Sequence, residues 1–440
     1  MTPQRVLMTE GTSLSARQTL TALGALASPD RQHVIDVMDP NPLCQGRFSR
    51  FTRRWIRCPH YAKEPEKFLA FLAEKVLSGR YDVLLPTHEQ VYLLSRFHHL
   101  LRPHIGIALP DFHSMDRMQN KALFMRLLKD LGIPHPESVP VRTRDELERE
   151  ARYPCYVKLG HSTAGSGVFL VENSDELADV ADRMESDGLL DGHCETVLQQ
   201  PAKGVQSTVQ AVFQHGRLVD AHLFEARRLG VGGMSPARVS ANHPVVFEHV
   251  AAMGEALRWH GATFIDYFYD HDRQRPEYIE ANPRIGETVN ATLCGTNLAE
   301  RLIDVSLDVD CPTMSPQDCA TKAEASAGRR TQSFYMIAIS DAYEGATRGQ
   351  LWRALRNWRG GRELYQNSAD ELSRLGEDPW SSLPVVWIMA QLLASPWGGS
   401  HRLVRQTIEN YSLPESAVER MLRVPMSALS DHLPARADRV

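Results

Sequence analysis

The sequence predicts an α/β protein: a doubly wound parallel sheet first, then an antiparallel-sheet core, then a mainly helical region. Three observations predict this. Strand and helix signals alternate through residues 1–110, hairpin-like strands follow over 261–290, and residues 331–440 carry mostly helical patterns. Strands that alternate with helices form a parallel sheet covered on both faces. At 440 residues the chain is too long for one core, so we expect several domains.

Composition is that of an ordinary globular protein, with 42% hydrophobic and 23% charged residues. A formal net charge of −5 argues against nucleic acid or an anionic membrane as the main partner. The seven cysteines are scattered singly, which fits a reducing cytoplasm better than a disulfide framework or a zinc site. The start lacks the apolar core of a signal peptide, and no apolar run reaches ~18 residues. We therefore expect a cytoplasmic protein without a membrane span.

The first 110 residues are expected to place strands at 5–9, 33–38, 82–85 and 105–109, with helices between them. The first turn has one glycine and does not match GxGxxG, so dinucleotide binding gains little support. Ligands of open α/β sheets bind at the carboxyl ends of the strands. The polar residues expected there also suit helix caps, and we expect Ser15 to be a cap; the group is Glu10, Ser13, Ser15, Thr87 and Glu89.

Two extended runs, 263–269 and 276–281, flank a charged connection that cannot bury. An antiparallel hairpin centred near Arg273 would place three pairs opposite each other on one side of the sheet: Phe268 with Tyr278, Asp266 with Glu280, and Phe264 with Asn282.

This register opposes two carboxylates, which a sheet normally avoids. At ~5 Å and an effective dielectric of ~20, their repulsion is on the order of 3 kcal/mol. A divalent cation held by Asp266, Glu280 and the amide oxygen of Asn282 would turn that repulsion into a site, and an all-oxygen set suits Mg²⁺. A solvated hairpin face, on which water screens the pair, is the alternative, and the hairpin alone leaves both open.

A glycine- and serine-rich loop at 160–167 lies between two expected strands, the first of which carries Lys158. Small residues let backbone N–H groups approach phosphates closely, and the lysine adds a point charge. An ordinary hairpin loop remains the alternative. The lysine precedes the loop, so the pattern differs from the P-loop GxxxxGK[ST].

The run Glu280-Ala281-Asn282-Pro283-Arg284, with Asp266 fourteen positions upstream, resembles the ExNPR signature of the ATP-grasp superfamily. The resemblance implies that Asp266, Glu280 and Asn282 hold Mg²⁺, or Mn²⁺, on the phosphates of ATP. It implies that Arg284 reaches the transferred phosphate or the acyl substrate. It also implies that residues 1–112 are the domain that precedes many ATP-grasp cores.

Further positions follow from the same resemblance. Lys121, at the start of an amphipathic helix over 120–132, and Lys158 would contact the phosphates, beneath a loop that contributes Ser162, Gly165, Ser166 and Gly167. The stretch 195–201 would be the hinge that reads adenine, with Gln199 and Gln200. Gln206 stands where the family usually has a glutamate for the ribose, so this part of the nucleotide site departs from the pattern.

A basic, glycine-containing stretch at 222–240, expected to be a flexible loop, carries Arg227, Arg228 and Arg238. Guanidinium groups suit recognition of a carboxylate or an acyl phosphate, while a solvated basic loop is the alternative. Together with Glu287, Glu10 and Glu89, these arginines are the candidate substrate residues.

The expected divisions are 1–112, an ATP-grasp domain at 113–310 with a lid at about 150–200 and a core at about 201–310, a linker at 311–330, and the helical region 331–440. The apolar run 383–397 is too short to span a bilayer and suits a buried helix or a homodimer interface. This last region faintly resembles that of standalone ATP-grasp ligases of secondary metabolism, such as those that make mycosporine-glycine.

The resemblance implies a ligase that uses ATP and Mg²⁺ to phosphorylate a small-molecule carboxylate and join it to an amine, releasing ADP and phosphate. Phosphorylation of an enol oxygen and carbamoyl-phosphate-type chemistry are alternatives, although the chain carries one copy of the constellation and not two. A non-catalytic ATP-binding regulatory module is the alternative of another class, and a nicotinamide-dependent reductase is a third.

Overall fold

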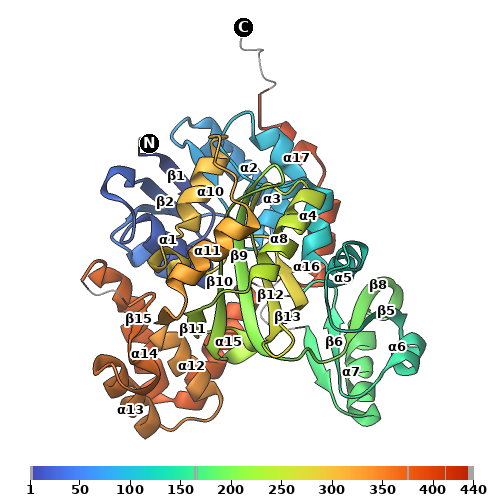
Figure 1. Ribbon diagram of the computed structural model, residues 1–440. Coiled ribbons are helices and arrows are strands. Elements are labelled where there is room, and N and C mark those ends of the chain that lie inside the picture. The colour runs from blue at the N-terminus through green and yellow to red at the C-terminus, as the bar shows by residue number, and fades with distance from the viewer. Residues whose placement is uncertain (1–2, 163–164, 166, 374–375, 412, 435–440) are drawn as a thin grey trace.

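The computed structural model describes residues 3–162, 165, 167–373, 376–411 and 413–434 and contains three sheets (Figure 1). One is a parallel sheet with helices around it, and the other two are largely antiparallel. The predicted α/β fold class is confirmed. Among the described residues, no helix combines the length and the apolar character needed to cross a bilayer.

The parallel sheet lies at the N-terminal end of the chain. Across the sheet its strands are β3 (Thr52–Ile56), β2 (Val34–Met38), β1 (Arg5–Met8) and β4 (Val83–Leu85). Helices α1 (Leu14–Leu23) and α2 (Pro65–Leu77) connect them, with the short 3-10 turns η1 (Pro29–Arg31) and η2 (Gln45–Phe48), and α3 (Gln90–Leu101) follows β4. The strand expected at 105–109 is reduced to one bridge between Val83 and Gly106. Strand β3 escaped prediction because its exposed side chains do not show a buried alternation.

A second sheet forms a separate lobe, at the lower right of Figure 1. Its strands are β5 (Ser138–Thr143), β8 (Asp191–Gln199), β6 (Cys155–Leu159) and β7 (Val168–Val171). Helices α6 (Arg144–Glu150) and α7 (Ser174–Ser186) bury their apolar sides against it. Helices α4 (Phe112–Gln119) and α5 (Lys121–Asp130) precede this lobe in the chain. We call residues 138–199 the lid.

The seven-stranded central sheet runs β13 (Arg275–Asn282), β12 (Gly261–Asp270), β9 (Val205–Gln214), β10 (Arg217–Arg228), β11 (Ala237–Ser240), β14 (Arg330–Gln332) and β15 (Ser368–Asp370). Helices α8 (Pro244–Ala256), α10 (Leu298–Ser306) and α11 (Pro316–Ser326) pack against it, and α9 (Val289–Leu293) follows β13 in sequence.

Two expectations fail in the central sheet. The stretch 222–240 is strand at both ends, in β10 and β11, whose residues pair across the sheet, and only 229–236, which contain the turn η3 (Val231–Gly233), lie outside a strand. The expected linker 311–330 contains α11, which begins with a Ser315–Asp318 capping box and packs on α8 and β10. Small polar residues suggested a loop there, but one face of the helix is buried.

The predicted hairpin register is correct at two of its three pairs. Asp266 pairs with Glu280, and Phe264 pairs with Asn282. The pairing of Phe268 with Tyr278 is wrong, because the register shifts between positions 266 and 267. A β-bulge of this kind inserts one residue and re-aims the side chains beyond it. Tyr278 therefore pairs with Tyr267, and both are fully buried.

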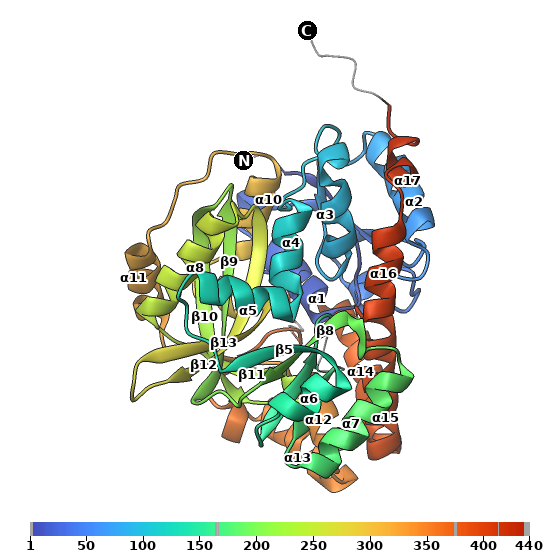
Figure 2. The same ribbon diagram turned by 90° about the vertical axis from the view of Figure 1, so that its right-hand side faces the viewer.

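The C-terminal region is mainly helical. It contains α12 (Phe334–Tyr343), α13 (Arg348–Arg359), α14 (Leu383–Ala394), α15 (Pro396–Tyr411), α16 (Glu415–Arg423) and α17 (Ser427–Ser430), with the 3-10 turns η4 (Glu363–Tyr365) and η5 (Pro379–Ser382). Helix α12 packs against α14 and α15. Helices α15 to α17 run along one side of the molecule, and α17 reaches α2 of the N-terminal domain (Figure 2).

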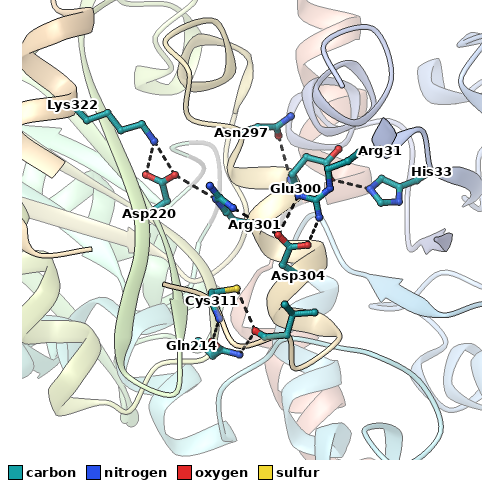
Figure 3. A network of polar contacts seen from close by, with 11 residues as sticks. Arg31, His33, Gln214, Asp220, Asn297, Glu300, Arg301, Asp304, Cys311 and Lys322 are labelled. Carbon is teal, nitrogen blue, oxygen red and sulfur yellow. Dashed lines mark hydrogen bonds and ion pairs between the residues drawn. The ribbon is translucent and has the colours of Figure 1, made fainter. Parts of the chain in front are cut away.

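Charged side chains on α10 connect the N-terminal domain to the central sheet (Figure 3). Arg31 of η1 forms an ion pair with Asp304, with one nitrogen 3.2 Å from Oδ2, and its Nε lies 3.3 Å from Glu300. His33 lies 2.9 Å from the same Glu300. On the other side, Arg301 of α10 lies 3.7 Å from Asp220 of β10, which also accepts hydrogen bonds of 2.9 and 3.0 Å from Lys322 of α11. We call Arg31, His33, Glu300 and Asp304 the hinge cluster.

Candidate functional site

Two acids and an amide project from the β12–β13 hairpin toward a cavity between the lid, the N-terminal domain and the C-terminal helices. Asp266 Oδ1 accepts a 2.6 Å hydrogen bond from the Thr208 hydroxyl, and Asn282 lies 3.4 Å from the other oxygen. Burial and the charge of Glu280 raise the pKa of Asp266 to about 7, although the Thr208 bond opposes them. Asp266 and Glu280 therefore lie opposite each other, as the predicted hairpin register has it, and would gain from additional positive charge.

Two lysines interact with these acids, Lys121 at the start of α5 and Lys158 in β6 of the lid. Lys121 Nζ lies 3.2 Å from Glu280 Oε1 and donates to the carbonyl and hydroxyl oxygens of Ser162. Lys158 Nζ donates a 2.5 Å hydrogen bond to Gln199 Oε1. Burial and the nearby Lys121 lower the pKa of Lys158 to about 8, while Glu280 opposes this. Acids and lysines from distant parts of the sequence thus interact electrostatically within one site.

The glycine-rich hairpin reaches across to the central sheet. A Cβ atom at Gly165 would come within 3.1 Å of Gly232 Cα, and Gly165 has φ +72, so both the contact and the backbone favour glycine. Gly167 accepts a 2.9 Å hydrogen bond from Leu159 and is buried. The predicted Ser166 lies outside the described residues. The hairpin therefore approaches turn η3, and Gly165 lines the cavity.

Arg284 lies between the central sheet and the N-terminal domain. Its guanidinium donates to Glu89 at 3.0 Å and to the Ser15 hydroxyl at 3.1 Å, and lies over the Phe264 ring. The expectation that Ser15 caps a helix is wrong, because Ser13 accepts the capping hydrogen bond of α1. Ser15, two residues further on, lines the cavity and accepts a hydrogen bond from Arg284.

A second basic group, Arg238 of β11, also lines the cavity. It forms a close ion pair with Glu287 and lies 3.5 Å from the buried Glu371. Gln206, at the predicted ribose position, lines the cavity and donates a 2.6 Å hydrogen bond to the carbonyl of Gly233.

Four predicted residues lie apart from the cavity or have their polar atoms occupied elsewhere. Arg228 forms ion pairs with Asp341 of α12 and with Glu344, which follows that helix, and Arg227 donates to the carbonyl of Leu364. Gln200 donates to the carbonyl of Arg152 within the lid. Glu10 is buried and accepts hydrogen bonds from the turn that follows it and from Thr87. Their side chains stabilise local structure in this conformation.

The cavity has a volume of about 300 Å³. Besides the predicted residues, its walls include groups that sequence reasoning did not single out: Thr208, Gln210, His88, Tyr335, Ile339 and Ile388. Thr208 and Gln210 pair with Asp266 and Phe264, so strand alternation could have found them once the order of the strands was known. No comparable signal existed for the residues from α12 and α14.

No protein-family model matches the chain. The carbamoyl phosphate synthase large chain of Pyrococcus furiosus is 24% identical over 207 residues, which cover 44% of this chain and 19% of that protein. The C-terminal section of the carbamoyl phosphate synthase large chain of Methanopyrus kandleri is 26% identical over 194 residues, covering 41% and 35%. The matched parts of this chain thus account for well under two thirds of either relative.

Solved structures resemble a larger part of the chain. The biotin carboxylase domain of the Hydrogenobacter thermophilus 2-oxoglutarate carboxylase superposes with a TM-score of 0.57 at 13% identity, covering 72% of each chain. An L-amino acid ligase from Bacillus licheniformis gives 0.53 at 14% identity, covering 75% and 79%. An N5-carboxyaminoimidazole ribonucleotide synthetase gives 0.53 at 15%, covering 71% and 79%. The chain has the ATP-grasp fold.

The ATP-grasp fold explains why the site has two halves. The lid supplies Lys158 and the glycine-rich hairpin, and the central sheet supplies Asp266, Glu280 and Asn282. The donor set from the central sheet, two carboxylates and an amide, fits a hard cation such as Mg²⁺. Gln199, the last residue of β8, accepts a hydrogen bond from Lys158.

Proposed function

We propose that this chain is an ATP- and Mg²⁺-dependent ligase that phosphorylates a carboxylate and joins the acyl phosphate to an amine. One observation carries the proposal: the opposed acids Asp266 and Glu280 line one cavity with Arg284, and two buried lysines, Lys121 and Lys158, interact with Glu280. Mg²⁺, held by the two acids and Asn282, would supply positive charge to the phosphates; Mn²⁺ has a similar preference for oxygen.

The protein's own groups would then position the substrates and neutralise the charge of the phosphates. In the first step a carboxylate oxygen attacks the γ-phosphorus of ATP, the bond to the bridging oxygen breaks, and ADP leaves. Lys121 and Lys158 would balance phosphate charge, and Arg284, fixed by Glu89, would stabilise the transferred group. The glycine-rich hairpin would keep water from the acyl phosphate.

In the second step the amine nitrogen attacks the acyl carbon, loses a proton, and phosphate leaves with an oxygen of the original carboxylate. Labelling that carboxylate with oxygen-18 tests the sequence of steps directly. With MgATP, the acid and an amine, one labelled oxygen should appear in the released phosphate for each amide formed. ADP formation without label in the phosphate would contradict an acyl phosphate.

A matched pair of variants tests the site. Glu280→Ala should abolish acceptor-dependent ADP release, whereas Glu277→Ala should retain it, because Glu277 lies on the same strand but outside the cavity lining. Equal ADP release by the two variants would contradict the assignment of Glu280 as a metal ligand.

Carbamoyl-phosphate-type chemistry is a second candidate, favoured by the similarity to carbamoyl phosphate synthase large chains. In that case bicarbonate alone should stimulate ADP release. An ATP-binding module without turnover is the remaining alternative, for which MgATP would raise the melting temperature but no acid would release phosphate.

We also infer a homodimer through the outer face of α14. Its inner face is buried, whereas Val386 and Trp387 are 64% and 66% exposed, and Leu383 lies beside them one turn earlier. Light scattering should give twice the chain mass, and Trp387→Glu should give one chain mass. A monomeric unmodified protein would contradict the dimer.

A further inference from the structure

The walls of the active-site cavity differ in character according to the part of the chain that forms them. The N-terminal domain and the β12–β13 region contribute mainly polar side chains, among them Ser13, Ser15, His88, Asp266 and Arg284, with Leu14 and Phe264 as apolar exceptions. The C-terminal helices contribute mainly apolar side chains: Met336 and Ile339 from α12, Ile388 from α14, and Leu403 and Val404 from α15. We call these five residues the apolar wall.

The apolar wall is held rigidly. Ile339 and Ile388 are 7% and 6% exposed and belong to the same core cluster, into which Leu403 and Val404 also pack. Helix α12 is tied to the central sheet, because Arg228 of β10 forms ion pairs with Asp341 and Glu344. The wall is therefore part of a folded core and not a loose flap over the cavity.

Helix α12 also contacts turn η3, which the glycine-rich hairpin of the lid approaches. The Ser340 hydroxyl accepts a hydrogen bond of 3.3 Å from the backbone N–H of Val231, at the start of turn η3. The next residue of that turn, Gly232, is the one that the lid residue Gly165 approaches. The apolar wall and the contact point of the glycine-rich hairpin thus meet at one end of the cavity.

Charged groups define where the head of a substrate would lie. Arg284 and Arg238 can each attract a carboxylate, and Glu287, which is 25% exposed, can attract an ammonium group. A small polar substrate such as bicarbonate would satisfy these groups and leave the apolar wall in water. A cavity of about 300 Å³ has room for more than a head group.

We propose that one of the two substrates joined by this enzyme carries a large apolar body, which packs on the apolar wall while its charged head faces Arg284, Arg238 and Glu287. This inference rests on the proposed ligase function and extends it to the class of substrate. Apolar α-amino acids and medium-chain carboxylic acids have this chemistry. Each added methylene group that reaches the wall should raise kcat/KM about fourfold.

The test uses the full chain, a non-hydrolysable ATP analogue with Mg²⁺ for binding, and ATP for turnover. The probes are the carboxylic acids from acetate to octanoate and the amino acids alanine, leucine, phenylalanine, serine, glutamate and lysine. Binding is read from the shift in melting temperature, and turnover from ADP release with an amine present. We expect octanoate, leucine or phenylalanine to exceed acetate, serine and glutamate in both readouts.

Two variants connect the preference to the wall. Ile388→Thr should lower kcat/KM for the best apolar substrate about tenfold while changing that for its shortest homologue by less than about twofold. Leu422→Thr introduces the same residue at an exposed aliphatic position of α16, outside the cavity lining, and should alter neither value. Met336→Glu, at a partly buried position, should reduce the preference for leucine and increase that for lysine.

The outcomes separate the two proposals. Apolar probes that bind without ADP release would support the apolar wall and overturn the ligase. Turnover of acetate, bicarbonate or glutamate at rates equal to or above those of the apolar probes would support the ligase and overturn the apolar substrate. No shift and no turnover with any probe would overturn both.

Discussion

Two clusters of charge in this molecule are built in opposite ways. In the hinge cluster, two acids on α10, Glu300 and Asp304, are met by Arg31 and His33 from the N-terminal domain. In the β12–β13 hairpin, Asp266 and Glu280 face each other, and Lys121 is paired to only one of them. The first cluster has partners for its charge within the protein, whereas the second is short of a cation.

The difference separates a structural role from a functional one. Buried charges with partners fix two parts of a fold relative to each other, although they add little net stability over apolar residues. Opposed carboxylates cost free energy in the unliganded protein and are understandable where a ligand supplies the missing charge. Removing an acid of the hinge cluster should therefore lower stability. Removing an acid of the β12–β13 pair should lower activity without lowering stability.

The largest expected effect is the loss of activity on substitution of Glu280. Glu280→Gln keeps the size of the side chain and removes its charge, so kcat should fall by about 10³-fold or more, because a group that holds charge near the phosphates is lost. Circular dichroism and the melting temperature should change little, since the side chain is 27% exposed to the cavity. A kcat within tenfold of the unmodified enzyme would show that the hairpin is not the metal site.

Next in size is the loss of stability on substitution of the hinge cluster. Asp304→Asn leaves the Arg31 guanidinium without its closest partner at a buried interface, and the free energy of unfolding should fall by about 3 kcal/mol. Urea unfolding at neutral pH measures this. Asp308→Asn, at a 58% exposed side chain paired with Arg102, is the matched control and should have a much smaller effect. Equal losses for both variants would contradict a buried structural pair.

The contrast between the clusters also shows what the sequence could reveal. The opposition of Asp266 and Glu280 follows from period-two alternation around a polar turn, so the acid pair could be predicted. The bulge after Asp266 could not be predicted, because the sequence of one strand does not indicate that the strand paired with it contains an extra residue. Ile339 and Ile388 could be predicted only as apolar positions of helices. Helical periodicity indicates that a residue is buried but not which cavity it lines.

In a third cluster, two acids face a histidine that supplies positive charge only when it is protonated. His161, at the base of the glycine-rich hairpin, lies 3.1 Å from Glu415 and 3.5 Å from Asp116. Burial opposes its charge, but the two acids raise the pKa of His161 to about 8, above the usual 6.5. A raised pKa stabilises the fold fully below the unfolded value, and this stabilisation is lost as pH rises through the folded value.

The unmodified protein should therefore lose roughly 2 kcal/mol of stability between about pH 6.5 and 8.5. Glu415→Gln should flatten that part of the profile, because the histidine then keeps one acid instead of two. Melting temperatures across this range provide the measurement. A profile of Glu415→Gln parallel to that of the unmodified protein would show that His161 is not the titrating group.

The smallest expected effect is a gain of stability at the acid pair. The pKa of Asp266 is raised from 3.8 to about 7, so the folded protein binds this proton more tightly than the unfolded chain; stability is lost as pH rises from about 4 to about 7, and the full cost is present at pH 8. Asp266→Asn removes the charge and keeps an oxygen for the Thr208 hydroxyl, and we expect a gain of about 1 kcal/mol at pH 8, since water in the cavity screens part of the repulsion. The measurement is urea unfolding with EDTA and without nucleotide. The same Asp→Asn change would then stabilise the acid pair and destabilise the hinge cluster at Asp304; a loss at both positions would mean that the acid pair is structural as well.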